Sequence, residues 1–227
     1  MRHRIHTRDP LSGLVTITGE EFHHAARVVR LREGEEVELF DGTGNAAAGV
    51  VQTMGSAELI VRVDRAIDSR EAANAVALAM AIINLDKFEL VLQKATELGV
   101  RTLIPLETER QEIRPERYRG KHERWQKIVF EATKQSGRAV IPQLEPPAPF
   151  DEIVQRDGAK ILFDADHPAT QQLSNPATLL IGPEGGWSER EIEIAKAHGC
   201  AFEQLGPRRL RAETAAMVAC ARHIGLC

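Results

Sequence analysis

The chain has 227 residues, of which 43% are hydrophobic and 27% are charged, and its formal net charge is −4. These values exclude a disordered or fibrous chain, and the length suits two modest domains with cores of their own. The negative charge argues against a protein that coats nucleic acid unspecifically. The longest apolar run, Ala75 to Ile83, is too short to span a bilayer, and Met1 to Pro10 lacks the apolar core of a secretory signal. We therefore expect a cytoplasmic protein with no membrane partner.

Residues 1–70 predict a small β-barrel with one helix. Asp41 to Asn45 reads DGTGN, a hairpin turn. Thr18 and Glu21 are spaced as a capping box that would open a helix through Val29. Short strand-like runs surround these signals at Leu14 to Ile17, Val37 to Phe40, Ala47 to Val51 and Leu59 to Val63.

Residues 74–227 predict a second domain of the α/β class with a mostly parallel sheet, after a polar linker at Asp68 to Asn74. Trp125 falls on the apolar face of a long helix ending near Gly137, so we expect it in the core. The alternation of elements runs through strand Val76 to Ile83, helix Lys87 to Leu98, strand Thr102 to Leu106, that long helix and strand Lys160 to Phe163.

The stretch from Leu179 to Ala215 carries two glycine-proline loops, each after a short apolar run. Leu179 to Ile181 and Phe202 to Leu205 read as strands, and Ser188 with Glu191 predicts a capping box for a helix between them. Loops at the carboxyl ends of parallel strands are where ligands bind, and glycine lets backbone groups approach them. The fingerprints GxGxxG after the early strand and GxxxxGK[ST] are absent. The pattern therefore favours an enzyme that holds a nucleoside-like ligand mainly through backbone hydrogen bonds.

The spacing of the cysteines and the distribution of charge indicate whether the protein binds metal ions or nucleic acid. Cys200, Cys220 and Cys227 form no CxxC pair, so we expect free thiols and neither a disulfide framework nor a metal site. Between Arg110 and Val140 nine Lys or Arg residues stand against four Glu. That segment either faces phosphates or is a solvated helix surface with i, i+4 pairs.

Five motifs follow one another along the chain: KFELVLQKATELGV at Lys87 to Val100, ETERQ at Glu107 to Gln111, EATKQSGR at Glu131 to Arg138, IGPEGGW at Ile181 to Trp187 and LGPRRLRAETA at Leu205 to Ala215. With these motifs, in this order, the chain resembles a known family, the SPOUT methyltransferases, and within them the RsmE-type enzymes that methylate N3 of a uridine in bacterial 16S ribosomal RNA. The resemblance covers nearly the whole chain. Gln111 departs from the family's small hydroxyl residue, and Ala212 from its common threonine.

The resemblance implies a PUA-like RNA-binding barrel followed by a methyltransferase domain whose C-terminal segment forms a trefoil knot. It also implies S-adenosylmethionine as cofactor, no metal, 16S ribosomal RNA within the small subunit as substrate, and a homodimer. The cofactor pocket would be lined by Phe163, Leu180, Ile181, Gly182, Pro183, Glu184, Gly185, Gly186, Leu205, Gly206, Leu210, Arg211 and Ala215. The RNA would be contacted by Arg27, Arg30, Arg32, Arg110, Arg114, Gln135 and Arg138.

The chemistry of methyl transfer to uracil N3 indicates which side chains would be catalytic. Methylation at N3 needs stabilisation of the uracil anion, which a guanidinium provides, and Arg211 is the first candidate. Alternatively, Arg211 is a structural partner of Glu213 or Glu184, and Glu213 merely opens the last helix, which runs to about Ile224. The proton leaves to Glu184, to Glu213 or to water. Two other functions remain open at this point: a different SPOUT activity, on ribose 2′-O or a tRNA base, and RNA binding without catalysis.

Overall fold

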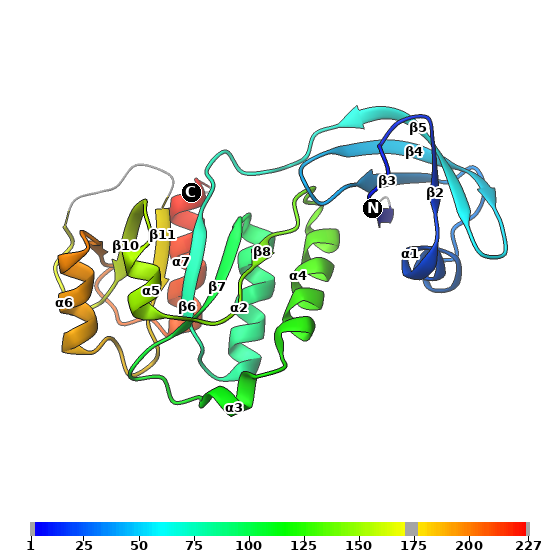
Figure 1. Ribbon diagram of the computed structural model, residues 1–227. Helices are drawn as coiled ribbons and strands as arrows, with labels where there is room; N and C mark the ends of the chain where they lie inside the picture. Colours follow the sequence, from blue (N-terminus) through cyan, green and yellow to red (C-terminus); the bar gives the residue numbers. More distant parts are fainter. Residues whose placement is uncertain (1–2, 171–176, 226–227) are drawn as a thin grey trace. The chain divides into compact units, whose positions relative to one another are not determined.

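The computed structural model describes residues 3–170 and 177–225. The chain divides into two compact units (Figure 1). One comprises Met1–Glu71 and Thr133–Ile141, and the other comprises Ala72–Ala132 and Pro142–Cys227. The sequence did not predict that residues 133–141 belong to the first unit.

The first unit is built on a five-stranded sheet in the order β1-β3-β4-β5-β2. β1 runs parallel to β3, and the other pairs are antiparallel. Four of the strands confirm the predicted runs, whereas β1 was not predicted. The strands are β1 (His3–His6), β2 (Leu14–Ile17), β3 (Glu36–Phe40), β4 (Ala46–Met54) and β5 (Leu59–Ile67).

The helical segment of this unit differs from the prediction. It consists of α1 (Gly19–His23) and a π-helical turn, η1 (His24–Val29). Thr18 is the N-cap, but its side chain makes no capping hydrogen bond, so the predicted capping box is wrong. The Glu21 carboxylate instead accepts the backbone N–H of His6 at 3.1 Å and forms an ion pair with Lys134 at 2.8 Å. These distant partners outcompete the local cap.

The turn between β3 and β4 confirms the hairpin predicted at Asp41. The carboxylate of Asp41 accepts hydrogen bonds from the backbone N–H and hydroxyl of Thr43 and from the backbone and side-chain amides of Asn45. Partial burial raises the pKa of Asp41, but these hydrogen bonds outweigh that effect and lower the pKa to about 2.

The second unit contains a seven-stranded sheet in the order β12-β10-β11-β6-β7-β8, with β9 also paired to β7. Every pair in it is parallel, which confirms the predicted α/β class. Its strands are β6 (Ala77–Ala81), β7 (Thr102–Glu107), β8 (Gln143–Leu144), β9 (Ala148–Pro149), β10 (Ala159–Phe163), β11 (Ala177–Ile181) and β12 (Ala201–Glu203).

Helices cover both faces of this sheet (Figure 1). Successive side chains of a strand point to opposite faces. Ala79 and Leu180 share a core cluster with residues of α5 and α6, while α7 packs against α2, β11 and β6. Trp125 is fully buried against Phe88, as predicted. The helices are α2 (Leu85–Leu98), α3 (Pro115–Tyr118), α4 (His122–Ser136), α5 (Phe150–Gln155), α6 (Glu189–Ala197) and α7 (Ala212–Ile224).

Two predictions about this unit have different outcomes. The capping box at Ser188 and Glu191 is present, and both of its hydrogen bonds form. The trefoil knot stays a prediction. Within the described part of the chain, no helix combines the length and the apolar character that crossing a membrane requires.

Candidate functional site

A pocket of about 600 Å³ lies where three neighbouring strands, β12, β10 and β11, reach their carboxyl ends. It is lined by the segments that follow those strands and by the start of α7. Its volume falls in the range of small-molecule sites. The two glycine-proline loops predicted to open on one site both line it.

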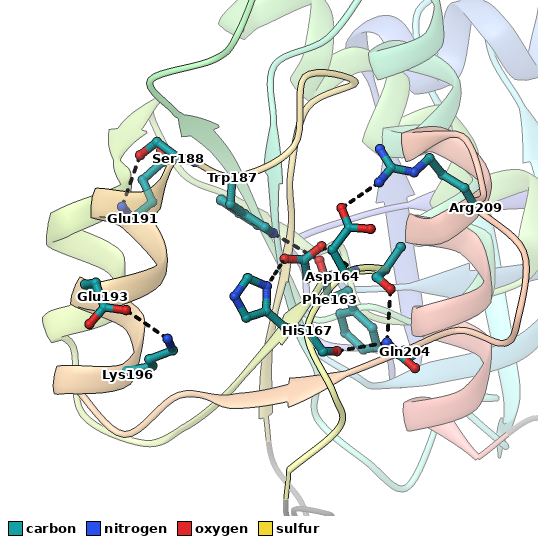
Figure 2. A network of polar contacts seen from close by, with 12 residues as sticks. Phe163, Asp164, His167, Trp187, Ser188, Glu191, Glu193, Lys196, Gln204 and Arg209 are labelled. Carbon is teal, nitrogen blue, oxygen red and sulfur yellow. Dashed lines mark hydrogen bonds and ion pairs between the residues drawn. The ribbon is translucent and has the colours of Figure 1, made fainter.

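The loop after β11 is shaped by close backbone packing. A side chain at Gly182 would place its Cβ 2.9 Å from the ring of Trp187, and one at Gly185 would lie 3.2 Å from Arg110. Gly186 has φ +69°, a backbone conformation that favours glycine. Trp187 is buried and donates from Nε1 to the carbonyl of Phe163 at 3.0 Å (Figure 2). The loop is therefore fastened to the end of β10.

The segment after β10, residues 164–167, forms the adjoining wall (Figure 2). His167 donates from Nδ1 to the Asp164 carboxylate at 2.6 Å. The Gln204 amide donates to the carbonyls of Ala165 and His167, at 3.0 and 2.9 Å. The short segment thus has a defined conformation even though it contains no regular element.

The loop after β12 brings three arginines to the pocket, Arg208, Arg209 and Arg211. Arg209 pairs with Asp166 at 2.6 Å. The guanidinium groups of Arg208 and Arg211 are exposed and have no ion-pair or hydrogen-bond partner among the residues that the structure describes. Arg211 is the N-cap of α7, so its position is set by the start of that helix.

The two carboxylates proposed as partners of Arg211 form ion pairs with Lys87 instead. Lys87 Nζ lies 3.3 Å from Glu184 Oε1 and 3.8 Å from Glu213 Oε1. Glu184 lines the pocket and Glu213 does not. In this structure Arg211 is therefore not the ion-pair partner of Glu184 or Glu213.

Arg110, predicted to contact RNA, also lines the pocket. Its Nη1 donates to the carbonyl of Gly185 at 3.3 Å. Gln111, the departure from the family pattern, folds the same loop: its amide accepts from the backbone N–H of Thr108 and donates to the carbonyl of Ile113. A longer polar side chain at this position therefore stabilises the loop that presents Arg110.

Most residues predicted for the cofactor pocket line it together. The exception is Leu180, which is fully buried in the core cluster with α5 and α6 because strand alternation turns it away from Ile181, which does line the pocket. The predicted residues brought together are Phe163, Ile181, Gly182, Pro183, Glu184, Gly185, Gly186, Leu205, Gly206, Leu210, Arg211 and Ala215.

The residues predicted to bind RNA are divided between the two units. Arg27, Arg30 and Arg32 are exposed near the end of η1 in the first unit. Arg114 lines a second hollow of the second unit, beside α3, and Gln135 is exposed on α4.

Arg138 requires a correction. It is 2% exposed, and its guanidinium pairs with Glu71 at 2.8 Å, while the same carboxylate accepts the N–H groups of Ala139 and Val140. A side chain buried in this way is held by a carboxylate of its own unit and is not available to a phosphate. Elsewhere in the basic segment Arg124 pairs with Glu89 on α2.

Several pocket residues were missed by the sequence analysis. Asp164 to His167 directly follow a predicted strand, so the rule applied to the other two strands would have found them. Glu203 lies in a predicted strand, and the other missed residues lie inside quoted motifs: Trp187, Arg208, Arg209 and Ala212. Cys200 and Cys220 are free and buried, and burial raises the pKa of the Cys220 thiol to about 12. Cys227 lies outside the described residues.

Comparison with known proteins assigns this architecture to a class. A family model described as an RNA methyltransferase domain matches residues 70–224, and a second, described as an RNA methyltransferase PUA domain, matches residues 17–64. The chain thus has the methyltransferase and PUA domains of an RNA methyltransferase.

The relatives are more specific. The ribosomal RNA small subunit methyltransferase E of Synechocystis sp. is 34% identical to this chain over an alignment 226 residues long. The alignment covers 93% of this chain and 73% of the relative. The same-named protein of Neisseria gonorrhoeae, solved with S-adenosylmethionine, superposes with a TM-score of 0.90 at 27% identity over 100% of this chain and 98% of its own. A protein of Legionella pneumophila, solved with the same cofactor, has a TM-score of 0.84 at 32% identity, and the match covers 98% of this chain and 96% of that protein. This chain belongs to the family of ribosomal RNA small subunit methyltransferases E.

Proposed function

We propose that this protein transfers the methyl group of S-adenosylmethionine to N3 of a specific uridine in 16S ribosomal RNA of the small subunit. One observation carries the proposal. A pocket of about 600 Å³ with two glycine-rich walls also presents two guanidinium groups, Arg208 and Arg211, that have no partner among the described residues. Glycine backbone suits a nucleoside ligand, and uncommitted guanidinium groups suit an anion that forms during the reaction.

The pocket residues fit the cofactor. Phe163, Ile181, Leu205, Leu210 and Ala215 offer apolar contact, and the glycines leave room for backbone hydrogen bonds. When bound, S-adenosylmethionine supplies a methyl group already activated on a sulfonium. The residues therefore need to bind and orient, and such positioning can supply about 7–11 kcal/mol of the barrier.

Arg211 is the proposed catalytic cation. Loss of the N3 proton leaves a uracil anion whose charge spreads to the flanking carbonyl oxygens, and a planar guanidinium can donate to such an acceptor. In the balanced reaction the methyl carbon leaves sulfur for N3, and the N3 proton leaves to a base. Glu184, Glu213 and water are the proposed acceptors, of which Glu184 lines the pocket.

RNA is proposed to bind through Arg27, Arg30 and Arg32 of the first unit and through Arg110, Arg114 and Gln135. All six are exposed or line a hollow, and phosphate contacts by the five arginines are strengthened at low salt. Arg138 is left out of this set because of its burial.

A homodimer and a cytoplasmic location complete the proposal. Leu90 on α2 and Val218 on α7 are 41% and 38% exposed, and these two helices pack together. Exposed apolar side chains on two neighbouring helices are compatible with a two-fold interface. Light scattering at micromolar concentration should give the mass of a dimer; a fully active monomer would refute this part.

The decisive experiment locates the methyl group. Purified protein is incubated with labelled S-adenosylmethionine and either free 16S RNA or small subunits that lack the modification, and the RNA is digested to nucleosides. We expect N3-methyluridine. Label on a ribose 2′-O or in tRNA would show a different methyltransferase activity, and cofactor-independent RNA binding without label would show a binding protein.

A further inference from the structure

Lys87 connects two carboxylates from different segments of the site. It lies in the first turn of α2, whereas Glu184 belongs to the loop after β11 and Glu213 to the first turn of α7. Its ammonium is 3.3 Å from one carboxylate and 3.8 Å from the other. A single cation thus joins the glycine loop to the helix that Arg211 caps.

Lys87, Glu184 and Glu213 together have one cationic and two anionic side chains. The Glu213 side chain is only 13% exposed, and its Oε2 is buried without a hydrogen-bond partner among the described residues. A carboxylate in such surroundings needs a cation nearby, since burying an uncompensated charge is costly. If Lys87 were neutral, both carboxylates would be available to another cation.

Arg211 is the cation that they would attract. It lies two residues before Glu213 and lines the same pocket as Glu184, and its guanidinium has no partner in the part of the chain described. A carboxylate and a guanidinium also form a favourable bidentate pair.

We propose that Lys87 is a positioning residue for methyl transfer: by engaging Glu184 and Glu213 it keeps Arg211 free for the substrate. The inference rests on the proposed role of Arg211. It assigns to Lys87 no contact with either reactant, so its effect must pass through the carboxylates.

A double-mutant cycle tests this dependence. Lys87→Met, Glu184→Gln and the double variant are compared for kcat on small-subunit RNA, for affinity to S-adenosylhomocysteine and for melting temperature. If Arg211 is captured in about nine of ten molecules, Lys87→Met lowers kcat about tenfold, equivalent to about 1.4 kcal/mol. In the Glu184→Gln background the same change should lower kcat by clearly less than in the wild-type background, because only Glu213 is then left to capture Arg211.

Two further variants sharpen the result. Lys87→Arg keeps the charge and should retain turnover. Lys94→Met, on the same helix, removes a lysine that pairs with Glu97 at 2.8 Å and does not line the pocket, and it should leave kcat unchanged. An equal loss from Lys87→Met in both backgrounds, or none in either, overturns the inference. A wild-type enzyme that methylates no RNA would instead refute the proposed function.

Discussion

Gly182 is the position where one added methyl group should disturb the pocket most directly. Its Cβ in a Gly182→Ala variant would lie 2.9 Å from Cε2 of Trp187 and 3.2 Å from Cδ2 and Nε1. The indole is 6% exposed, packs on Phe150 at 5.1 Å between ring centroids, and donates to the carbonyl of Phe163. The ring therefore cannot move without disturbing neighbours on both sides.

The expected magnitude follows from these contacts. Overpacking of this size costs about 1–3 kcal/mol, and weakening the buried indole hydrogen bond costs about 1 kcal/mol more. Restricting the unfolded chain offsets about 0.4–1 kcal/mol, because Gly182 does not have a positive φ. A net loss of about 1–4 kcal/mol leaves the protein folded, since domains are typically stable by about 5–15 kcal/mol.

Binding and stability should change together in this variant. Urea denaturation gives the stability, and calorimetry with S-adenosylhomocysteine should give a dissociation constant raised about tenfold, which corresponds to about 1.4 kcal/mol. Gly199→Ala is the control. Gly199 has φ +68° with open space around it and does not line the pocket, so a stability loss of about 1–2 kcal/mol with unchanged affinity is expected. Wild-type affinity and stability in Gly182→Ala would refute the reasoning.

Four other perturbations address different parts of the molecule. Arg211→Lys should lower turnover about 10²-fold to 10³-fold with unchanged melting temperature and cofactor affinity; a sharp fall in melting temperature would make Arg211 structural. Reversing the charges of Arg114, Arg117 and Lys121 together should weaken RNA binding and flatten its salt dependence, measured by filter binding; unchanged binding would indicate a solvated surface. The lowered pKa of Asp41 stabilises the fold above its ordinary value of 3.8, so the stability difference between wild type and Asp41→Asn should shrink as pH falls towards about 2. Cys220 should resist iodoacetamide in the native protein and react after unfolding, as read by peptide mass spectrometry, because its thiol pKa is about 12.

Local signals in the sequence succeeded where the partners of a residue are close in the chain. The capping box at Ser188 needs only Glu191, three residues on, and it forms. The turn at Asp41 is likewise held by Thr43 and Asn45. Five strands of the second unit, β6, β7, β10, β11 and β12, were also predicted, since a fully buried parallel strand must be apolar, whereas the two-residue strands β8 and β9 were not predicted.

Predictions from local sequence were wrong or missing where the partner of a residue lies far away in the chain. Glu21 was predicted to cap its own helix, but it pairs with Lys134, more than a hundred positions away. β1 reads HRIH and is a strand because it pairs with β3, not because of strong β propensity. Arg138 was assigned to RNA from the family resemblance and its place in a basic segment, and only the fold places it against Glu71. In each case a long-range ion pair or strand pairing outweighs the local preference.

The ion pairs around the pocket explain how a chain with a net charge of −4 can act on an anionic substrate. The carboxylates around it are each engaged by a donor: Asp164 by His167, Asp166 by Arg209, Glu203 by His223, and Glu184 by Lys87. Arg208 and Arg211 have no such engagement in the described part of the chain. The charge left uncommitted at the site is therefore positive although the protein as a whole is negative. Because a guanidinium acts on a reacting anion only if no carboxylate already holds it, the arrangement of these pairs matters more for catalysis than the net charge of the chain.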